Sequence, residues 1–527
     1  MTITGDLLIG GQAVRGKHGK MRAVNPATGE EMEPVFVGGD SHDVDKACSL
    51  AQTAFDAYRS TSLEDRAVFL EAIAQGILDL GDELVDRVVS ESGLTRGRIE
   101  GERGRTCGQL RLFASIARAG RWLNPVIDPA LPERQPLPRP DLRSRKIPVG
   151  PVAVFGASNF PLAFSVAGGD TAAALAAGCP VVAKSHPSHL GTSELIGRVI
   201  QAAVAQCGLP EGVFSLLVGE GNAVGEALVR HPAIQAVAFT GSRRGGLALV
   251  AMAAARPNPI PVFAEMSSTN PVFLLPAALA ERGAALAKGL VDSATLGVGQ
   301  FCTKPGIVLG IDGPEFQQFA KDAVVATENA AAGTMLNAGI HNAFLKGAEE
   351  LQRANAVEQI AEGKAASTGH CAAQAMLFST TGQAVLSSQR LTEEVFGPTT
   401  LLVACKDEAE MLAVAEQLEG QLTATIHLAD SDLTIAQRLL PTLERKVGRI
   451  LVNGFPTGVE VSHAMVHGGP FPSTSDNRAT SVGGMAIERF LRPICYQNFP
   501  VGLLPEALLP ENPLSLWRLV DGKLEQA

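Results

Sequence analysis

Polar and hydrophobic residues recur with helical periodicity over residues 40–121. Apolar side chains such as Phe69 and Ile73 lie three or four positions apart, which places them along one face of a helix. Ser62, with Asp65 three residues later, has the spacing that caps a helix start. The pattern therefore predicts a helical region before the first sheet.

The helical pattern ends at a proline-rich stretch over residues 124–140, which reads NPVIDPALPERQPLPRP. Proline lacks the backbone donor that a helix needs and cannot continue one. We therefore expect an extended arm or a domain boundary at this point of the chain.

Short apolar runs alternate with alanine- and leucine-rich helical segments from Pro148 onward. This alternation is typical of a parallel sheet with helices on both faces. The expected strands are 152–155, 181–184, 214–218 and 236–239. A second alternating region predicts a second α/β domain, with strands near 271–275, 306–310, 400–404 and 422–427.

Bulk properties narrow the class of protein. The 527 residues are 46% hydrophobic and 19% charged, which is the composition of a folded protein of more than one domain. The formal net charge of −10 and the absence of a dense basic run argue against a nucleic-acid-binding surface. The sequence offers no apolar stretch long enough for a membrane span and no signal-peptide pattern, so we expect no membrane association.

Eight cysteines are scattered along the chain without a CxxC pair. That spacing is typical of neither a zinc site nor a disulfide framework. We therefore expect no metal, reduced thiols and a cytoplasmic location.

Two residues have neighbours that suit catalysis. Cys302 lies in the glycine-rich stretch GVGQFCTKPG, where a substrate can reach it, although most cysteines only fill the core. A catalytic role requires a nearby base or positive dipole to generate the thiolate. Glu265 ends the apolar run PIPVFAEMSS at the carboxyl end of an expected strand, where α/β sheets place their sites. Burial there is expected to raise the pKa of Glu265 into the range of a general base.

Other strand ends carry groups that can bind anions. Asn159 follows VAVFGAS and can donate to a developing oxyanion, a contact worth about 3 kcal/mol in a transition state. Residues 239–246, FTGSRRGG, predict a strand, a turn and a helix whose first N–H groups, with Ser242, can meet a pyrophosphate. Lys184 ends another strand and can reach a ribose or a phosphate.

These pieces, in this order, resemble the aldehyde dehydrogenase superfamily over nearly the whole chain. The matching segments are NPATGE (25–30), GASNFPLAF (156–164), VVAK (181–184), FTGS (239–242), AEMSS (264–268), GQFCTKPG (299–306) and EEVFGP (393–398). The resemblance implies NAD(P)-dependent oxidation of an aldehyde to a carboxylic acid through a thiohemiacetal and a thioester on Cys302. Glu265 would be the general base, and Asn159 with the Cys302 N–H would form the oxyanion hole.

The same resemblance implies a dinucleotide site. Lys184 would contact the adenosine ribose, Ser242 the pyrophosphate, and Glu394 with Phe396 the nicotinamide ribose and ring. The cofactor-binding residues expected on this basis are Lys184, Ser185, His186, Phe239, Thr240, Gly241, Ser242, Gly246, Glu394 and Phe396.

Two departures from the family pattern stand out. The usual ELGG at the base is EMSS here, which keeps Glu265 but changes the backbone beside it. Pro187 stands where NAD-preferring members often carry a glutamate that repels a 2′-phosphate. We therefore expect NADP to be preferred over NAD.

Three segments suggest a subgroup: GQFCTKPG, MVHGGPFPSTSDNRATSVG (465–483) and FLRPICYQNFP (490–500). They resemble α-ketoglutarate semialdehyde (2,5-dioxopentanoate) dehydrogenases and related bacterial NADP-dependent fatty-aldehyde dehydrogenases. The first substrate carries a carboxylate and needs a cation in the tunnel. Arg105 is the candidate for this cation and could bind the carboxylate with two hydrogen bonds. The alternative is that Arg105 is a solvated arginine on a helix. The other candidate tunnel residues are Phe160, Phe164, Phe301 and Phe471.

The expected architecture is α/β and aldehyde dehydrogenase-like, in three parts. A Rossmann-like cofactor domain would comprise residues 1–123 and 148–266, and an α/β catalytic domain residues 267–486. Residues 124–147 and 487–527 would form a β-rich oligomerisation arm and tail, which is marginal alone and should pair with another subunit in a homodimer or homotetramer.

Three alternatives remain open from the sequence. The substrate could be a long-chain fatty aldehyde. A cofactor-independent cysteine esterase could use the same nucleophile, base and oxyanion donor, and an aldehyde assay without NAD(P) separates it from a dehydrogenase. The third alternative is a non-catalytic scaffold, but such a protein would not need a nucleophile, a base and an oxyanion donor together.

Overall fold

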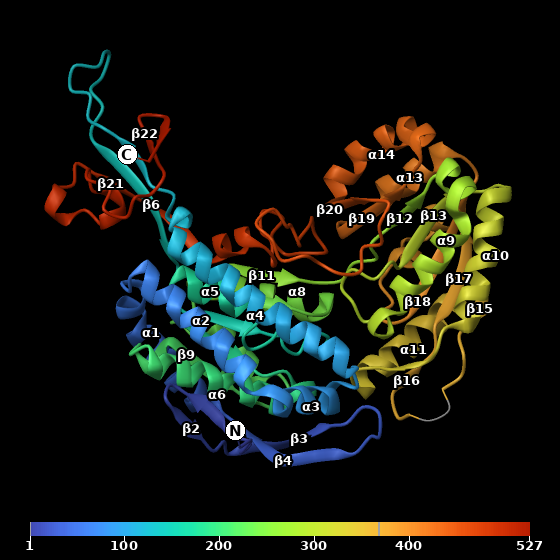
Figure 1. The fold of residues 1–527 in the computed structure, drawn as a ribbon, viewed down its shortest axis with the longest axis horizontal. Coiled ribbons are helices and arrows are strands. Elements are labelled where there is room, and N and C mark those ends of the chain that lie inside the picture. The colour runs from blue at the N-terminus through green and yellow to red at the C-terminus, as the bar shows by residue number, and fades with distance from the viewer. Residues whose placement is uncertain (1, 367–368, 527) are drawn as a thin grey trace.

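A computed structural model of the chain describes residues 2–366 and 369–526. Figure 1 shows two α/β lobes side by side and a smaller β-rich arm that carries the C-terminus. The first lobe contains a seven-stranded sheet in the order β11-β10-β7-β8-β9-β1-β2. Its strands are β1 (Leu7–Ile9), β2 (Gln12–Val14), β7 (Val152–Phe155), β8 (Val181–Lys184), β9 (Phe214–Leu217), β10 (Ala236–Thr240) and β11 (Val262–Glu265). The four strands expected here are confirmed, and β7 to β11 run parallel.

Alternate residues of these strands enter two separate cores, which is why the strands read as continuous apolar runs. Val152 and Val154 pack into one core with α2, α4, α5 and α6. Ala153 and Phe155 pack into the other with α1, α7 and α8. The helices are α1 (Ser41–Arg59), α2 (Leu63–Asp79), α3 (Gly81–Ser92), α4 (Arg96–Ala119), α5 (Gly169–Ala177), α6 (Leu190–Gln206), α7 (Ala223–Arg230) and α8 (Arg243–Ala254).

The helical region expected before the first sheet is confirmed by α1 to α4. Ser62 is the N-cap of α2, and its hydroxyl accepts a hydrogen bond from the Asp65 N–H at 3.0 Å. A hairpin precedes these helices and consists of β3 (His18–Val24) and β4 (Glu31–Gly38).

The second lobe contains another seven-stranded sheet in the order β15-β17-β18-β13-β12-β19-β20. Its strands are β12 (Val272–Leu274), β13 (Ile307–Ile311), β15 (Glu358–Glu362), β17 (Met376–Thr381), β18 (Thr399–Cys405), β19 (Gln421–His427) and β20 (Val447–Val452). The helices of this lobe are α9 (Pro276–Thr295), α10 (Pro314–Asn329), α11 (Ala338–Gln352), α12 (Gly382–Ser387), α13 (Glu408–Gln417) and α14 (Leu433–Lys446). A short pair, β14 (Gly333–Thr334) and β16 (Ala372–Ala373), lies beside them. The second α/β region is therefore also confirmed.

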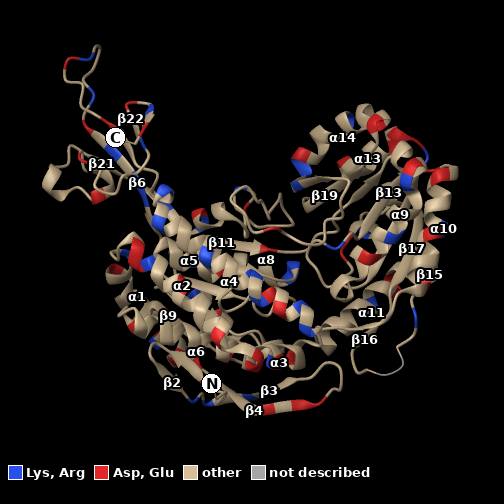
Figure 2. Cartoon of the chain, viewed as in Figure 1, with Lys and Arg blue, Asp and Glu red and all other residues tan. Residues whose placement is uncertain are grey.

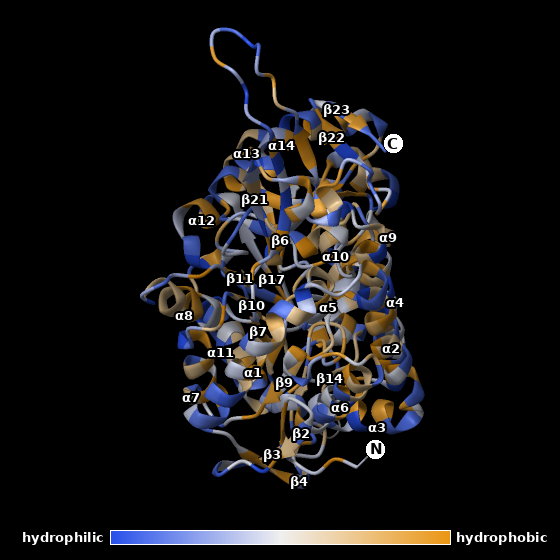
Figure 3. Ribbon diagram, turned by 90° about the vertical axis from the view of Figure 1, so that its left-hand side faces the viewer, coloured by the Kyte–Doolittle hydropathy of each residue, from blue (hydrophilic) through white to orange (hydrophobic). Residues whose placement is uncertain are grey.

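The arm is a five-stranded sheet in the order β21-β6-β5-β22-β23. It combines β5 (Val126–Asp128) and β6 (Leu142–Pro148) with three strands from the end of the chain, namely β21 (Leu491–Gln497), β22 (Arg518–Val520) and β23 (Lys523–Glu525). The loop between β5 and β6 projects away from both lobes (Figures 1 and 3). The proline-rich stretch is thus an extended arm.

The chain returns from the second lobe to the first after β20. Residues 473–475 lie along the edge strand β11, where Ser473 O accepts from Met266 N at 2.8 Å and Ser475 Oγ accepts from Ala264 N at 2.8 Å. The return brings side chains of residues 465–481 next to Glu265, the last residue of β11.

The surface has mixed charge. Figure 2 shows acidic and basic residues interspersed along both lobes and the arm. No helix in the described part of the chain is both long and apolar enough to cross a membrane.

Candidate active site

Cys302 lies between the two lobes, directly after a tight turn. Gly297, Val298 and Gly299 all have positive φ, which for the β-branched Val298 is a strained backbone conformation. A Cβ on Gly299 would lie 2.3 Å from the Gly397 carbonyl carbon, so only glycine fits there. Asn270 Nδ2 then donates to the Cys302 carbonyl at 2.8 Å and fixes the backbone that carries the thiol.

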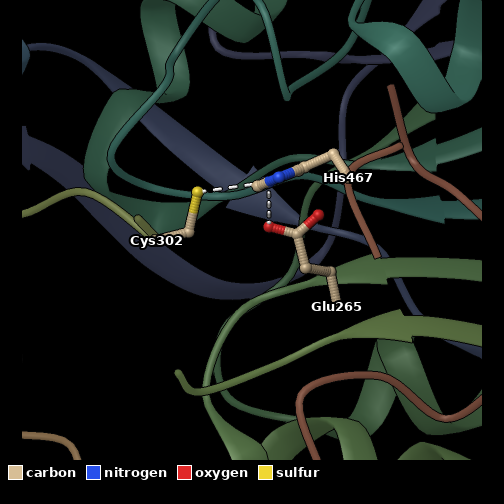
Figure 4. Close-up of side chains that lie close together, drawn as sticks. All are labelled: Glu265, Cys302 and His467. Carbon is tan, nitrogen blue, oxygen red and sulfur yellow. Dashed lines mark hydrogen bonds and ion pairs between the residues drawn. The ribbon is translucent and has the colours of Figure 1, made fainter. Parts of the chain in front are cut away.

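The Cys302 thiol meets two other groups that come from distant parts of the chain (Figure 4). Its Sγ lies 3.3 Å from His467 Nε2, and the same nitrogen lies 2.9 Å from Glu265 Oε1. The Ser481 hydroxyl donates to the other Glu265 oxygen. Both His467 and Glu265 are buried, whereas Cys302 is half-buried. The sequence prediction that Cys302 and Glu265 lie together is in line with this geometry.

The charge state of Glu265 differs from the sequence-based expectation. Burial raises its pKa, but the charge and hydrogen bond of His467 and the hydrogen bonds from Ser481 and Cys302 lower it by more. The net pKa lies below the ordinary value, so the expectation of a raised pKa is wrong. The expectation treated the strand end as apolar and did not include the imidazole, which is 202 residues away in sequence.

The Cys302 thiol has the opposite shift. Burial and the adjacent Glu265 charge raise its pKa well above the ordinary value, and the Arg105 charge opposes them. The cysteine is therefore a neutral thiol beside an ionised carboxylate and an imidazole. Such an arrangement supplies both an acceptor for the thiol proton and a group that stabilises the protonated acceptor.

Asn159 lies in the loop after β7, on the same cavity wall as Cys302. Its Nδ2 donates to the Gln300 carbonyl at 2.9 Å, two residues before the thiol. The amide has a second N–H, so one donor remains available for a ligand.

A groove with a volume of about 990 Å³ runs past these groups. We call it the cofactor groove. It is lined by most of the residues that were expected to bind a dinucleotide, namely His186, Phe239, Thr240, Gly241, Ser242, Glu394 and Phe396, as well as by Asn159, Glu265 and Cys302. The groove lies at the carboxyl ends of β7, β8, β10 and β11, where a parallel sheet places a ligand.

The groove has features that fit an anionic dinucleotide. Helix α8 begins in it, and Ser242 is its N-cap, whose hydroxyl accepts from the Gly245 N–H at 3.2 Å. The N-terminus of such a helix is an anion site because its first N–H groups and its dipole both favour negative charge.

Three expected cofactor residues do not line the groove as the sequence suggested. Lys184 is half-buried and its amine donates to the Ser185 carbonyl at 3.1 Å. Ser185 is buried behind it. Gly246 faces Met266, whose sulfur would lie 2.6 Å from an added Cβ, so this glycine serves the packing of α8 against β11.

Lys304, which the sequence analysis did not single out, is buried near the half-buried Glu394. The Lys304 amine donates to the carbonyls of Val395 and Thr399 at 3.0 and 2.6 Å, which holds the segment that carries Glu394. Burial lowers the pKa of Lys304 to about 8 and raises the pKa of Glu394 to about 7.

On the other side of Cys302, three phenylalanines form a compact aromatic cluster. The Phe160 ring lies edge-on to those of Phe164 and Phe301, with centroids 5.1 and 5.2 Å away. The sequence-based grouping of these residues is in line with their positions. Phe471 is not part of the cluster, because it is exposed and its ring lies beside Arg243, 5.7 Å from the guanidinium carbon.

Two arginines near this cluster have no acidic side chain within salt-bridge distance in the described residues. The Arg105 guanidinium, from α4, lies over the rings of Phe160 and Phe164, and its Nε and Nη2 are buried without a hydrogen-bond partner. Arg449, from β20, donates to the carbonyls of Gly458 and Pro456, and its Nε is likewise unpartnered. Burial lowers the pKa of both arginines and the charge of Cys302 opposes it, while the Arg105 charge adds to the lowering of the Arg449 pKa. We call them the arginine pair.

Sequence reasoning missed His467, Ser481, Arg449 and Lys304. His467 and Ser481 fall within the segment 465–483, which was noted only for its resemblance to a subgroup. A single histidine in a loop has no periodic signal, so only the fold could place it beside Cys302.

Comparisons with known proteins agree with this geometry. The family model described as "Aldehyde dehydrogenase family" matches residues 13–491. The chain is 59% identical over 526 residues to alpha-ketoglutaric semialdehyde dehydrogenase 2 of Azospirillum brasilense, covering 100% of both chains. It is 50% identical to alpha-ketoglutaric semialdehyde dehydrogenase of Acinetobacter baylyi, covering 99% of both.

Solved structures share the fold. The aldehyde dehydrogenase C mutant of Pseudomonas syringae, in complex with NAD⁺ and octanal, superposes with a TM-score of 0.80 at 23% identity, covering 94% of this chain and 97% of that one. Lactaldehyde dehydrogenase of Escherichia coli gives a TM-score of 0.80 at 23% identity, covering 93% and 98%. The chain belongs to the aldehyde dehydrogenase family and is an enzyme that oxidises an aldehyde to a carboxylic acid with NAD(P).

Proposed function

We propose that the substrate is α-ketoglutarate semialdehyde (2,5-dioxopentanoate) and the product α-ketoglutarate. The observation that carries this proposal is the arginine pair beside the aromatic cluster. Two full-length relatives at 59% and 50% identity, whose names give this semialdehyde, support it.

The arginine pair suits the far end of this substrate. A buried guanidinium without a counterion is costly, and a carboxylate that accepts from both arginines would offset that cost. Arg105 offers its unpartnered Nε and Nη2, and Arg449 its Nε. A long-chain aldehyde would leave both charges uncompensated against an alkyl chain, so the geometry favours the semialdehyde over a fatty aldehyde.

We assign the chemistry to residues that converge on one point. The Cys302 thiol passes its proton to Glu265, and the His467 Nε2–H donates to the same carboxylate and orients it. The Cys302 thiolate attacks the aldehyde carbon, and the oxyanion is held by Asn159 and the Cys302 N–H. NAD(P) bound in the cofactor groove supplies the hydride acceptor. After the first proton has left to solvent through the groove, Glu265 removes a proton from the water that hydrolyses the Cys302 thioester.

For the cofactor we propose NADP in preference to NAD. Pro187 lines the groove in place of a residue that would repel a 2′-phosphate, and the side chains of Arg22 and Arg244 line it as well. A comparison of kcat/KM for the two cofactors at saturating aldehyde tests this; a clear preference for NAD contradicts it.

We further propose a cofactor domain of residues 1–123 and 148–266, a catalytic domain of residues 267–486, and an oligomerisation arm of residues 124–147 and 487–527. The arm exposes large apolar side chains, among them Leu137, Leu503 and Leu524, which a second subunit would cover in a homodimer or homotetramer. Light scattering of the purified protein tests this. The cysteines are all unpaired, which supports a cytoplasmic location.

The substrate is tested by kcat/KM for α-ketoglutarate semialdehyde, succinic semialdehyde and a long-chain aldehyde, each with both cofactors. We expect the first to be preferred by at least about 100-fold over the long-chain aldehyde, since a hydrogen-bonded charge pair contributes about 1.5–3 kcal/mol. Equal values for the charged and uncharged aldehydes would contradict the assignment. Acid formation without NAD(P) would instead favour the esterase alternative.

A further inference from the structure

The side chains of Glu265, Cys302 and His467 together form a set of metal-ligand atoms: a carboxylate oxygen, a sulfur and an imidazole nitrogen. We infer that this cluster also binds a zinc-like divalent cation, and that the bound cation reversibly blocks the enzyme. The inference concerns the nucleophile of the proposed function, but it stands on the ligand geometry alone.

The distances fit a metal with little rearrangement. The three ligand atoms all lie within 4.8 Å of one another, with 3.3 Å between Cys302 Sγ and His467 Nε2 and 2.9 Å between that nitrogen and Glu265 Oε1. Zinc bonds of about 2.0–2.3 Å in a tetrahedron place ligand atoms about 3.3–3.8 Å apart. The two distances to His467 Nε2 would widen by a few tenths of an ångström, and the Cys302 and Glu265 atoms, which lie within 4.8 Å, would adjust to the same range.

Neighbouring groups hold two of the three ligands in place. The backbone N–H of His467 donates to Thr480 Oγ1 at 2.8 Å, and the Ser481 hydroxyl donates to Glu265. These bonds fix the backbone that carries the imidazole and orient the carboxylate, which favours metal binding. His467 and Glu265 are buried, so the ligands lose little freedom on binding.

The fourth coordination position is open. Cys302 is half-buried and, with Glu265, lines the cofactor groove, so an ion can enter and keep a water molecule. Three protein ligands and one open position are typical of an exchangeable zinc site. On coordination the thiol proton leaves to solvent, and the sulfur that attacks the aldehyde is occupied. A bound ion therefore inhibits turnover.

The donor set selects the kind of ion. Thiolate and imidazole favour Zn²⁺, Co²⁺ and Cd²⁺, whereas Mg²⁺ and Ca²⁺ prefer oxygen ligands. The absence of CxxC pairs does not bear on this site, because its ligands come from three segments that are distant in sequence.

Cobalt titration tests the site without turnover. Chelator-treated wild-type protein is titrated with Co²⁺, and we expect one equivalent to produce a near-ultraviolet thiolate-to-cobalt absorption band that Cys302→Ala abolishes. Zn²⁺ should displace the cobalt, and Mg²⁺ should not. A cobalt spectrum without a thiolate band, or a band that persists in Cys302→Ala, would overturn the inference.

Inhibition gives a second, independent measurement. Zn²⁺ should inhibit aldehyde-dependent NAD(P)H formation, and a chelator should restore it. His467→Asn should raise the Kd for Co²⁺ at least about 100-fold, since even supporting residues of metal sites change affinity about 10–100-fold. The control is Cys207→Ser/Cys495→Ser, which removes thiols that are accessible outside the cluster and should leave Zn²⁺ sensitivity unchanged. Loss of sensitivity in this control would overturn the inference. Because the cobalt spectrum needs no turnover, it separates this failure from failure of the proposed function.

Discussion

The two sides of Cys302 are built in different ways. One wall of the cofactor groove is formed by the ends of adjacent parallel strands: β7 pairs with β8 and β10, and β10 with β11. The substrate side is formed by side chains from α4, the loops after β7 and α9, β20 and the returning segment. The order of the strands therefore places part of the cofactor site, whereas substrate specificity depends on individual side chains from scattered elements.

Removal of the Cys302 thiol should have the largest effect on kcat, because the cofactor and the substrate must both meet at this sulfur. Cys302→Ala should lower kcat by at least about 10⁴-fold, the loss typical of a missing nucleophile. NAD(P)H formation measures it, and Cys495→Ala, which alters an exposed cysteine, is the control. Substantial residual turnover would remove Cys302 from the mechanism.

Loss of the imidazole should be the next largest effect. His467→Asn should lower kcat by about 10²–10³-fold, since the imidazole orients the general base Glu265 and a positioned base contributes in that range. KM for NADP should stay nearly constant, because His467 does not line the cofactor groove. His463→Asn, on the same loop but exposed, is the matched control. An unchanged kcat would mean that Glu265 needs no support from the imidazole.

Substitutions in the arginine pair should distinguish the substrate side of Cys302 from the cofactor side most clearly. Arg105→Met or Arg449→Met should lower kcat/KM for α-ketoglutarate semialdehyde by about 100-fold, which corresponds to loss of a hydrogen bond to a charged group. Activity on an uncharged aldehyde of similar length should change much less. Arg111→Met, on the exposed side of α4, is the control. Equal losses of kcat/KM on the charged and the uncharged aldehyde would contradict a role of the arginine pair in binding the carboxylate.

The smallest effect is expected on the cofactor side. Ser242→Ala removes the N-cap of α8 and should raise KM for NADP by about 5-fold, with about 1 kcal/mol lost in stability. Ser62→Ala removes the corresponding cap of α2, so it should lower Tm to a similar extent without changing KM. An equal KM change in both variants would make the effect one of stability alone.

Much of the fold could be predicted because its signals are local. Apolar runs such as 152–155 and 181–184 are continuous since both faces of the sheet are covered, and they mark strands directly. Cys302, Glu265 and Asn159 were found because each lies in a short motif at a strand or helix end. Their convergence was implied by the resemblance to the aldehyde dehydrogenase superfamily, because the motifs stand in the order of that family.

The rest depends on contacts that no local pattern encodes. His467 reverses the pKa shift of Glu265 from 202 residues away. Arg449 resembles any strand arginine until β20 is placed beside the aromatic cluster. Phe471 looked like a tunnel residue by composition, but the return of the chain along β11 leaves its ring at the surface beside Arg243.

The strand-like return of residues 473–475 along β11 also restricts how the enzyme can exchange its cofactor. The hydrogen bonds between Met266 N and Ser473 O and between Ser475 N and Ala264 O, at 2.8 and 3.0 Å, tie the end of the second lobe to the edge of the first sheet. A hinge motion that separated the two lobes would have to break these two hydrogen bonds. We therefore expect the two lobes to stay joined at β11 while a nucleotide enters or leaves the cofactor groove.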